Sequence, residues 1–451
     1  MTYILNTFVF LSLIVTSIAY SANDSGNMKN QILPENFIGK MLVSVSDADM
    51  IGSAYVDGML GMREGRDAIS VIPLGKPIRE LKAHETEVSN SVAGPAIAVT
   101  VTPDGNYAFV VESFKARPEG PWENQKFSDL PIGNTITLVD LTKPTNPKIL
   151  QKLTIADRPD AVSISAKGDL VAVTFNPNGG GTKHPLAIIP FNEGQLGRPT
   201  YPEVPRLPKG NRLMQAEWHP TKPVLALVDN TDAVVSFVNV KKENDDYQLK
   251  PWGNKVKIGK SPYMARFTPD GRYLISNNLY WGVDVQGKWV EAPRGDVVSI
   301  RLNAGKQKNG RPRHALVSRA MTSVGPEGLA ISPNGLMVVT ANVERSFLPY
   351  EDKRLTPFSS ITLLKLNPQT GQLTRVSDYA FDGILTEAIA FDASNQYLAV
   401  TSFDHFDDQV TGGSIDFWRV TSDPLIPGSI LVKTNSSIPV SRGIHSMVLV
   451  K

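Results

Sequence analysis

The sequence predicts an all-β fold, a seven-bladed β-propeller made of four-stranded blades. A strand–turn–strand pattern recurs along the chain at a spacing of roughly sixty residues. Two further strand-like runs follow each copy, and the chain ends in half a copy. Four strands per repeat, with half a repeat left at one end, are typical of a ring whose two chain ends pair in one blade.

The repeat is clearest in "GPEGLAISPNGLMVVTAN" at residues 325–342. Apolar residues alternate along the first strand, and a β-branched run forms the second. Pro-Asn-Gly supplies the turn, because Gly accepts positive φ and Pro fixes the residue before it. The third and fourth strands follow, as in "NTITLVDL" and "KILQKLT" after the first copy. The other full copies occupy residues 94–113, 158–176, 212–230, 261–278 and 385–404.

The half copy "RGIHSMVLVK" at residues 442–451 predicts the innermost strand of the seventh blade. The segments "GKMLVSVSD", "RDAISVIPL" and "RELKAHETEV" near the N-terminus would supply its outer three strands. Such closure hides two sheet edges. Several small β-sandwiches in a row would need linkers of Pro, Gly and Ser, which the evenly spaced units lack. The sequence therefore favours one propeller over residues 40–451.

The first residues, "MTYILNTFVFLSLIVTSIAY", hold an apolar run that stops at small residues. We expect a secretory signal peptide at residues 1–21 and a flexible N-terminal segment at residues 22–39. The run is slightly short for a membrane span, and an uncleaved anchor is the alternative. This pattern predicts a periplasmic or secreted protein with no stable membrane span after cleavage.

Composition excludes several classes of function. The chain has no Cys, which excludes disulfides and a haem attached through Cys-x-x-Cys-His. With 46 basic and 44 acidic residues the formal charge is +2, so nucleic-acid binding is not expected. The sequence contains no Gly-x-Ser-x-Gly elbow, His-Glu-x-x-His pair or Walker loop.

Two of the repeats, "GPEGLAISPNGLMVVTAN" and "SPYMARFTPDGRYLISNN", resemble the YVTN-type (WD40-like) repeat of the seven-bladed lactonase-like β-propellers. The four-residue signature takes the forms "FVVE", "LISN" and "VVTA" here, and the resemblance covers roughly residues 40–451. That family includes 6-phosphogluconolactonase-like proteins. The resemblance therefore implies the fold and makes lactone hydrolysis a candidate activity, but no catalytic motif of the family matches residue by residue.

One face of the predicted propeller carries unusually long loops. Inner strands begin on this face, and the loops between second and third strands return to it. Binding residues gather on such loops. We expect a small ligand or a protein partner to bind here, around the mouth of the central channel. The long loops are residues 47–67, 112–134, 175–184, 277–295, 342–358 and 402–413.

Aligning the first strands on their turns places one residue of each blade at the same height in the channel. In the first blade this position falls on Ile97 or Ala96. Three arginines, Arg158, Arg212 and Arg442, lie shortly before it in their strands, nearer the mouth. The residues at this height in the other blades are Asp160, Met214, Tyr263, Glu327, Glu387 and His445.

We call this set of residues, one from each blade at the same height in the channel, the ring. It has three interpretations. Asp160, Glu327, Glu387 and His445 could hold Ca²⁺ or a transition metal. Alternatively, a glutamate or His445 acts as general base on water, while the arginines bind a substrate carboxylate or the developing oxyanion. The third interpretation is a solvated polar channel with Arg–carboxylate pairs and no ligand.

The sequence thus leaves three functions open. The first is an exported propeller that binds a ligand or partner without chemistry. The second is a lactonase-like hydrolase of a small sugar or carboxylate lactone, with or without a metal. The third is a redox accessory protein with a non-covalent cofactor, which a chain without Cys permits.

Overall fold

The computed structural model describes residues 35–91, 97–178, 182–281, 288–422 and 429–451. The expected signal peptide and most of the segment at residues 22–39 lie outside these ranges. Its last five residues are packed on the propeller, and Phe37 is fully buried with its ring edge-on to Phe417 at 5.3 Å. The compact unit begins at Glu35, a few residues before the predicted start at residue 40, because Phe37 completes an apolar cluster.

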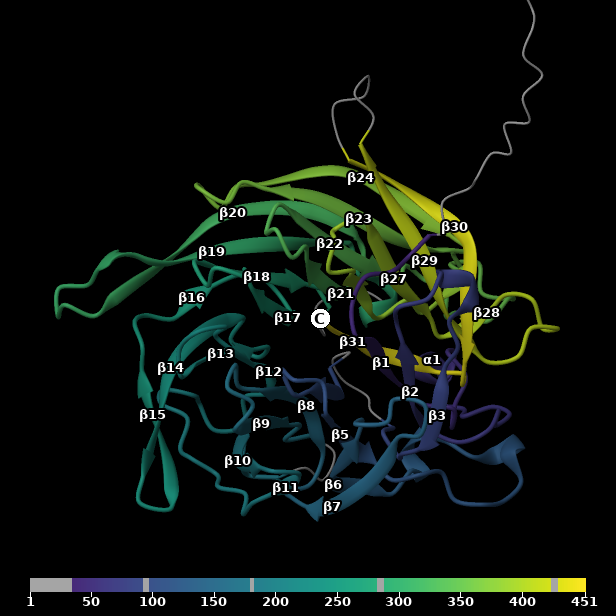
Figure 1. Ribbon diagram of the computed structural model, residues 1–451, viewed down its shortest axis with the longest axis horizontal. Helices are drawn as coiled ribbons and strands as arrows, with labels where there is room; N and C mark the ends of the chain where they lie inside the picture. The colour runs from purple at the N-terminus through teal and green to yellow at the C-terminus, as the bar shows by residue number, and fades with distance from the viewer. Residues whose placement is uncertain (1–34, 92–96, 179–181, 282–287, 423–428) are drawn as a thin grey trace, which may run out of the picture. The chain divides into compact units, whose positions relative to one another are not determined.

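The predicted seven-bladed propeller is confirmed. Seven sheets, each with a path of four antiparallel strands, surround a central axis (Figure 1). Their innermost strands contact one another in a closed cycle, β31–β4–β8–β12–β17–β21–β26 and back to β31. No helix in the described part of the chain has the length and apolarity to cross a membrane.

The first three blades follow chain order. Blade 1 contains β4 (Val99–Val101), β5 (Tyr107–Phe114), β6 (Ile132–Asp140) and β7 (Lys148–Thr154). Blade 2 contains β8 (Pro159–Ile164), β9 (Leu170–Phe175), β10 (Leu186–Asn192) and β11 (Gln195–Leu196). Blade 3 contains β12 (Leu213–Trp218), β13 (Val224–Asp229), β14 (Val234–Glu243) and β15 (Asp246–Pro251), with the short β16 (Val256–Lys257) also paired to β14.

The next three blades continue in the same way. Blade 4 contains β17 (Pro262–Phe267), β18 (Tyr273–Asn278), β19 (Arg294–Lys306) and β20 (Pro312–Val324). Blade 5 contains β21 (Pro326–Ile331), β22 (Met337–Asn342), β23 (Ser359–Leu366) and β24 (Leu373–Phe381). Blade 6 contains β26 (Ile389–Phe391), β27 (Tyr397–Ser402), β29 (Gly413–Ser422) and β30 (Ser429–Val440).

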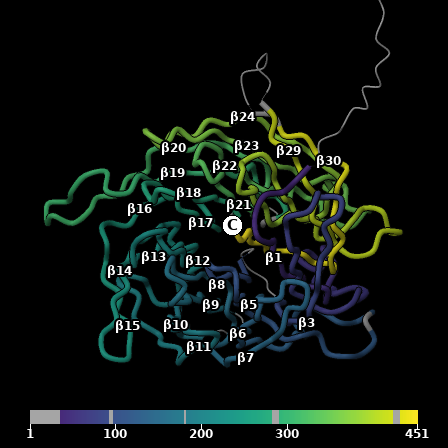
Figure 2. The backbone as a smooth tube through the Cα atoms, in the orientation of Figure 1, coloured from purple at the N-terminus to yellow at the C-terminus, as the bar shows by residue number. Residues whose placement is uncertain are grey.

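The seventh blade closes the ring as predicted. Its strands are β31 (Ile444–Val450), β1 (Met41–Ser46), β2 (Ala68–Pro73) and β3 (His84–Glu87). Antiparallel pairing of β1 with β31 places Val43 opposite Val448, although these residues are at opposite ends of the sequence. Figure 2 shows the C-terminal strand beside β1 near the centre of the ring.

Tight turns join the first and second strands of the blades. Gly105, Gly168, Gly271 and Gly335 occupy the same turn position with φ between 66° and 76°. In blade 6 Asn395 takes this place with φ 66°, since Asn tolerates the left-handed region better than most residues. The tight turns that the sequence predicted from these Gly residues are therefore present in the structure.

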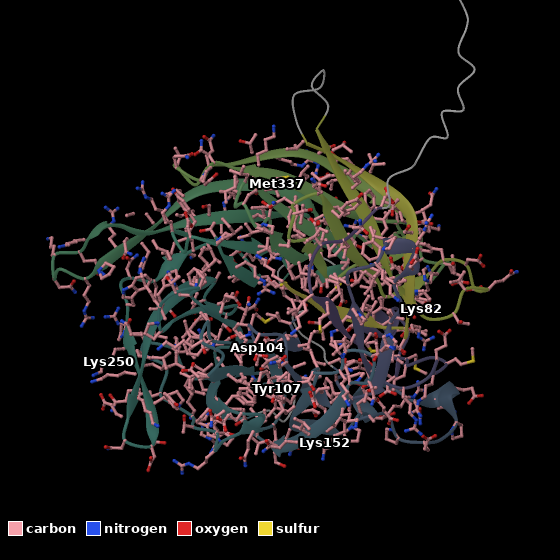
Figure 3. The ribbon with its side chains drawn as sticks, in the orientation of Figure 1. Lys82, Asp104, Tyr107, Lys152, Lys250 and Met337 are labelled. Carbon is pink, nitrogen blue, oxygen red and sulfur yellow. The ribbon has the colours of Figure 1, made fainter. Side chains whose placement is uncertain are left out.

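The remaining elements are short and lie in the loops. They are α1 (Ala54–Asp57), η1 (Ile78–Glu80), η2 (Trp122–Asn124), η3 (Phe127–Asp129), η4 (Lys288–Glu291), and a two-stranded sheet of β25 (Gly383–Ile384) and β28 (Asp404–His405). Apolar side chains fill the space between blades, whereas Lys250 of β15 lies at the outer rim (Figure 3).

Candidate active site in the central channel

The inner strands share an irregularity at the height predicted to face the channel. Strands β8, β12, β21 and β31 each contain a β-bulge that leaves one residue without a ladder partner: Asp160, Met214, Glu327 and His445. In β17 the ladder skips Tyr263 and its neighbour Met264. A bulge bends the strand and re-aims its side chain. The predicted register thus coincides with a structural feature repeated around the ring.

The other two blades reach this height just before their inner strands begin. Glu387 precedes β26 by two residues and is buried. Ile97 precedes β4 by two residues and is also buried, whereas Ala96 lies outside the described residues. Ile97, Met214 and Tyr263 belong to one apolar cluster. The acids Glu327 and Glu387 lie in the neighbouring blades 5 and 6, whereas the third acid, Asp160 of blade 2, lies apart from them.

Glu327 and Glu387 form an acidic pair. Both are buried, each with 5% of its surface exposed. The hydroxyl of Tyr263 donates a 2.9 Å hydrogen bond to Oε2 of Glu327 from the adjacent inner strand. Asn277 of β18 donates from Nδ2 to the backbone oxygen of Glu327 at 3.0 Å, which holds this strand in place.

Burial changes the acidity of both carboxyl groups. Burial raises the pKa of Glu327 to about 7. The hydrogen bond from Tyr263 acts in the opposite direction and lowers this pKa. Burial and then the negative charges of Glu327 and Asp47 raise the pKa of Glu387 well above its usual range. Two nearby carboxyl groups cannot both ionise cheaply. Near neutral pH, Glu387 therefore keeps its proton while Glu327 titrates.

A long loop covers this pair. Its helix α1 carries Tyr55, whose pKa is raised well above the usual range by burial and by the charges of Glu387, Asp47 and Glu327. Five of the six predicted long loops contribute to one apolar cluster, the cap, which includes Met50, Phe114, Val290, Phe347 and Phe403. Together these loops therefore build a hydrophobic layer.

A cavity of about 320 Å³ runs along the channel axis, and Glu387 lines it. It extends to Pro333 in the turn after β21 and to Lys451, on the face of the tight turns. Each blade contributes one residue to the cavity wall, three positions after its channel-facing residue in the sequence. These wall residues are Thr100, Ser163, Glu217, Arg266, Ala330, Ala390 and Val448. The walls combine apolar side chains with polar groups, among them an ion pair between Arg266 and Glu217 at 3.2 Å. The cavity that Glu387 lines therefore extends toward the tight-turn face of the propeller, which is opposite to the face of the long loops.

The predicted substrate-binding arginines are engaged by the protein itself. Arg212 binds Oδ2 of Asp160 through Nε at 2.8 Å and Nη2 at 2.6 Å. Arg158 donates to the backbone oxygen of Asn178 at 2.8 Å and stacks over the ring of Phe114. Of these contacts, only the one between Arg212 and Asp160 is an Arg–carboxylate pair, and Asp160 is fully buried.

Arg442 ties down the loop at residues 47–67. Its guanidinium group forms an ion pair with Glu64 at 3.4 Å and donates to the backbone oxygens of Met62 and Ala48. Arg117 holds the same loop by donating to the backbone oxygens of Asp49 and Gly61. The structure therefore gives Arg442 a role in anchoring the loop that covers the acidic pair.

His445 is buried and uncharged at neutral pH. Burial lowers its pKa to about 3. Its Nε2 lies 2.7 Å from Oδ1 of Asn90, whose Nδ2 donates to the backbone oxygen of Ser46. Because Oδ1 is then the acceptor, Nε2 carries the proton, and Nδ1 has no hydrogen-bond partner among the described residues. A group with such a low pKa is a weak base, so the geometry does not favour His445 as the general base.

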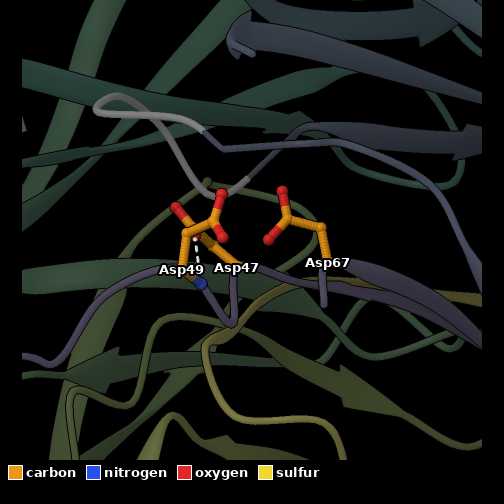
Figure 4. Close-up of side chains that lie close together, drawn as sticks. All are labelled: Asp47, Asp49 and Asp67. Carbon is orange, nitrogen blue, oxygen red and sulfur yellow. Dashed lines mark hydrogen bonds between the residues drawn. The ribbon is translucent and has the colours of Figure 1, made fainter. Parts of the chain in front are cut away.

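Three aspartates that sequence reasoning missed lie together beside this site. Asp47 and Asp49 follow β1, Asp67 precedes β2, and their carboxyl groups point toward one another (Figure 4). All three are buried, and one oxygen of each lies within 4.8 Å of the others. The motif "SDAD" at the end of a strand was the available signal in the sequence.

The predicted metal ligands Asp160, Glu327, Glu387 and His445 do not form such a group; within the described ranges, only the aspartate cluster does. Its oxygens suit a hard cation. However, the hydroxyl of Ser91 lies 2.9 to 3.4 Å from all three carboxyl groups, and Arg63 lies 3.5 Å from Asp49. Burial, followed by the charges of Asp47 and Asp49, raises the pKa of Asp67 well above its usual range. Protonation of Asp67 would lower the repulsion among the three carboxyl groups.

Comparison by sequence gives no relatives: no family model matches the chain, and no curated protein matches it. Comparison by structure gives many. The periplasmic gluconolactonase PpgL of Pseudomonas aeruginosa has a TM-score of 0.58 and 15% identity, over 91% of this chain and 99% of that one. A candidate 6-phosphogluconolactonase of Bacteroides uniformis has a TM-score of 0.57 and 13% identity, over 91% and 99% of the two chains.

Other similar structures carry different descriptions. A hypothetical selenium-binding protein of Sulfolobus tokodaii has a TM-score of 0.55 and 10% identity, over 91% of this chain and 94% of that one. At these identities the likeness shows the fold alone. The predicted lactonase-like propeller is thus confirmed as a fold, and function has to be argued from the site.

Proposed function

We propose that this protein hydrolyses a small lactone in its central channel, with Glu327 and Glu387 as the acid–base pair. The observation that carries the proposal is the pair itself: two buried carboxyl groups with different pKa values, one of which lines a cavity. Pairs of titratable groups whose environments separate their pKa values define acid and base roles. The shared fold with a protein named as a gluconolactonase supports the same class of reaction.

Each carboxyl group has a defined role in this proposal. Glu327, with a pKa of about 7, accepts a proton from the attacking water. The water oxygen bonds to the lactone carbonyl carbon, and the ring C–O bond then breaks. Glu387, which keeps its proton, gives it to the leaving ring oxygen. The product is a hydroxy acid, and proton exchange within the pair restores the starting state.

The size and lining of the cavity support a small substrate. Its volume of about 320 Å³ is near the lower end of the range for ligand pockets, roughly 300 to 1,000 Å³. The walls of the cavity combine apolar and polar groups. Arg266 and Glu217 provide polar contacts on the same wall.

The test is hydrolysis of a panel of sugar and aliphatic lactones, followed by pH-stat titration. We expect Glu327→Gln and Glu387→Gln each to lower kcat by roughly 10²- to 10⁴-fold, the usual contribution of general acid–base catalysis. Glu112→Gln is the matched control, because burial also raises the pKa of Glu112 to about 7 but this residue is in the second strand of blade 1, away from the pair.

Two outcomes would refute the proposal. One is a wild-type protein that hydrolyses no lactone of the panel faster than buffer. The other is a Glu387→Gln variant that folds normally and keeps wild-type kcat. Either result would leave ligand or partner binding without chemistry as the function of the propeller.

We also propose that the chain is exported to the periplasm or secreted. The support is the apolar N-terminal run ending in small residues. The comparable gluconolactonase is named as periplasmic. N-terminal sequencing of the protein from a periplasmic extract should give a first residue near Ser21, and an intact Met1 would count against cleavage.

A further inference from the structure

A second cavity, separate from the channel, lies between blades 2 and 3 on the long-loop face. Its volume is about 710 Å³. The loop between β9 and β10 lines one side, and the segment that leads into β12 lines the other. The first of these is the one predicted long loop that does not contribute to the apolar cap.

The lining of this cavity is strongly basic. Lys183, Arg206 and Lys209 line it, and Glu203 is its single acidic residue. The rings of His184 and Tyr201 lie against each other there, with centroids 4.4 Å apart and planes tilted by 32°.

The three cations are available for a ligand. Their side chains have no ion pair or hydrogen bond within the described parts of the chain. All three residues are exposed to solvent. Most basic side chains near the channel are, by contrast, paired, as Arg212 is with Asp160.

The backbone holds Arg206 in an unfavourable conformation. Arg206 follows Pro205 in a turn closed by a hydrogen bond from the amide of Leu207 to the oxygen of Val204. Its φ is 63°, in the left-handed region. A turn with Pro second and positive φ third is of type II, where Gly is the favoured third residue.

The surroundings fix this turn and increase the positive charge. Lys255 donates from Nζ to the backbone oxygen of Arg206 at 2.6 Å. A second turn follows directly, closed by the amide of Asn211 and the oxygen of Pro208, with Gly210 at φ 87°. The prolines limit the motion of the segment, so the cavity is formed before any ligand arrives.

We propose that this cavity binds a small polyanion, a molecule with at least two phosphate or carboxylate groups. Arg206 would bind one anionic group through its planar guanidinium, and Lys183 and Lys209 would bind the others as point charges. The rings of Tyr201 and His184, which line the cavity, would contact the body of the ligand. This site does not depend on lactone hydrolysis and is a property of the long-loop face.

The test is isothermal titration calorimetry of the full chain with two probes, pyrophosphate and citrate. We expect at least one to bind with a Kd below about 1 mM at low ionic strength, and more weakly as salt is added. Binding of pyrophosphate alone would identify a phosphate ligand, and binding of citrate alone a polycarboxylate. Binding of both probes would show recognition of charge common to the two.

Arg206→Gly is the decisive variant. Loss of one charge-assisted contact should weaken binding at least about tenfold, while Gly at a type II position should leave the Tm equal or higher. Lys308→Gln, in the distant hairpin between β19 and β20, is the control and should bind as the wild type does.

Three results would overturn the proposal: no binding of either probe up to about 10 mM, wild-type binding by Arg206→Gly, or an equal loss in Lys308→Gln. A fall in Tm for Arg206→Gly with binding retained would show that Arg206 is structural.

Discussion

The hydroxyl of Tyr263 donates a 2.9 Å hydrogen bond to Oε2 of Glu327, joining the inner strands of blades 4 and 5 at the height of the acidic pair. A hydrogen bond to a carboxylate favours its charged form. Tyr263 therefore holds the pKa of Glu327 below the value that burial alone would give.

Tyr263→Phe should raise the pKa of Glu327 further, because the buried carboxylate loses its donor. The acidic limb of the pH–rate profile should move to higher pH, or the Glu327 resonance in a ¹³C NMR titration should do so. Tyr280→Phe is the control, since that hydroxyl donates to Asp296 at 2.6 Å instead. A profile for Tyr263→Phe that is unchanged or shifted to lower pH would contradict the assigned contact.

Glu327→Gln should change how stability depends on pH. The folded-state pKa of about 7 lies above the ordinary value of 4.5, so the folded chain binds more protons than the unfolded chain between these values. The contribution of Glu327 is therefore fully present below pH 4.5 and is lost as pH rises through 7. Replacement by Gln should raise the free energy of unfolding at pH 8 by on the order of 3 kcal/mol.

Urea denaturation at pH 5 and pH 8 checks this prediction. The difference between Glu327→Gln and wild type should be much larger at pH 8 than at pH 5. The exposed Glu351→Gln should show the wild-type dependence at both. An equal effect of Glu327→Gln at the two pH values would mean that its carboxyl group is not buried as described.

Arg212→Met should strongly destabilise the fold. Asp160 is fully buried and binds the guanidinium group through Oδ2. Removing this cation takes away the direct ion-pair partner of a buried carboxyl group and leaves only the charge of Arg158 nearby. Breaking a buried pair in this way costs roughly 3–5 kcal/mol. The double variant Asp160→Asn with Arg212→Met should recover much of that loss in thermal unfolding. If the double variant were as unstable as the single one, packing of Arg212 would be the cause instead of charge.

Gly443→Ala should weaken ring closure. A Cβ at this position would lie 1.8 Å from the backbone oxygen of Asp47, and φ is 86°. The amide of Asp47 also donates to the oxygen of Gly443 at 2.9 Å, so the two chain ends cannot separate without losing that bond. We expect a loss of more than about 2 kcal/mol, measured by chemical denaturation.

Gly65→Ala is the control that separates the steric clash at Gly443 from the cost of a positive φ. Its φ is 93°, but nothing lies within 4 Å of the added Cβ. It should therefore cost only about 1 kcal/mol, the cost of a left-handed conformation. Equal losses in the two alanine variants would show that closure near Asp47 tolerates the added atom.

The sequence alone determined the blades, the closure of the propeller and the position in each inner strand that belongs to the ring, because these depend on local patterns. Alternating apolar residues and Gly-containing turns repeat at each blade, and the half copy ending at Lys451 requires a partner strand near Met41. The register that selected Asp160, Glu327 and His445 follows from counting residues back from the turns, and the same count locates the bulges.

Only the tertiary structure decided what each ring residue does. Glu327 and His445 share a height in the channel, but one has a pKa of about 7 and the other of about 3, because burial and partners from other blades differ. The aspartate cluster, the apolar cap and the basic cavity at Arg206 all join loops distant in sequence. Loop conformation and contacts between blades have no sequence period, so pairings such as Arg212 with Asp160 emerge only when the ring is closed.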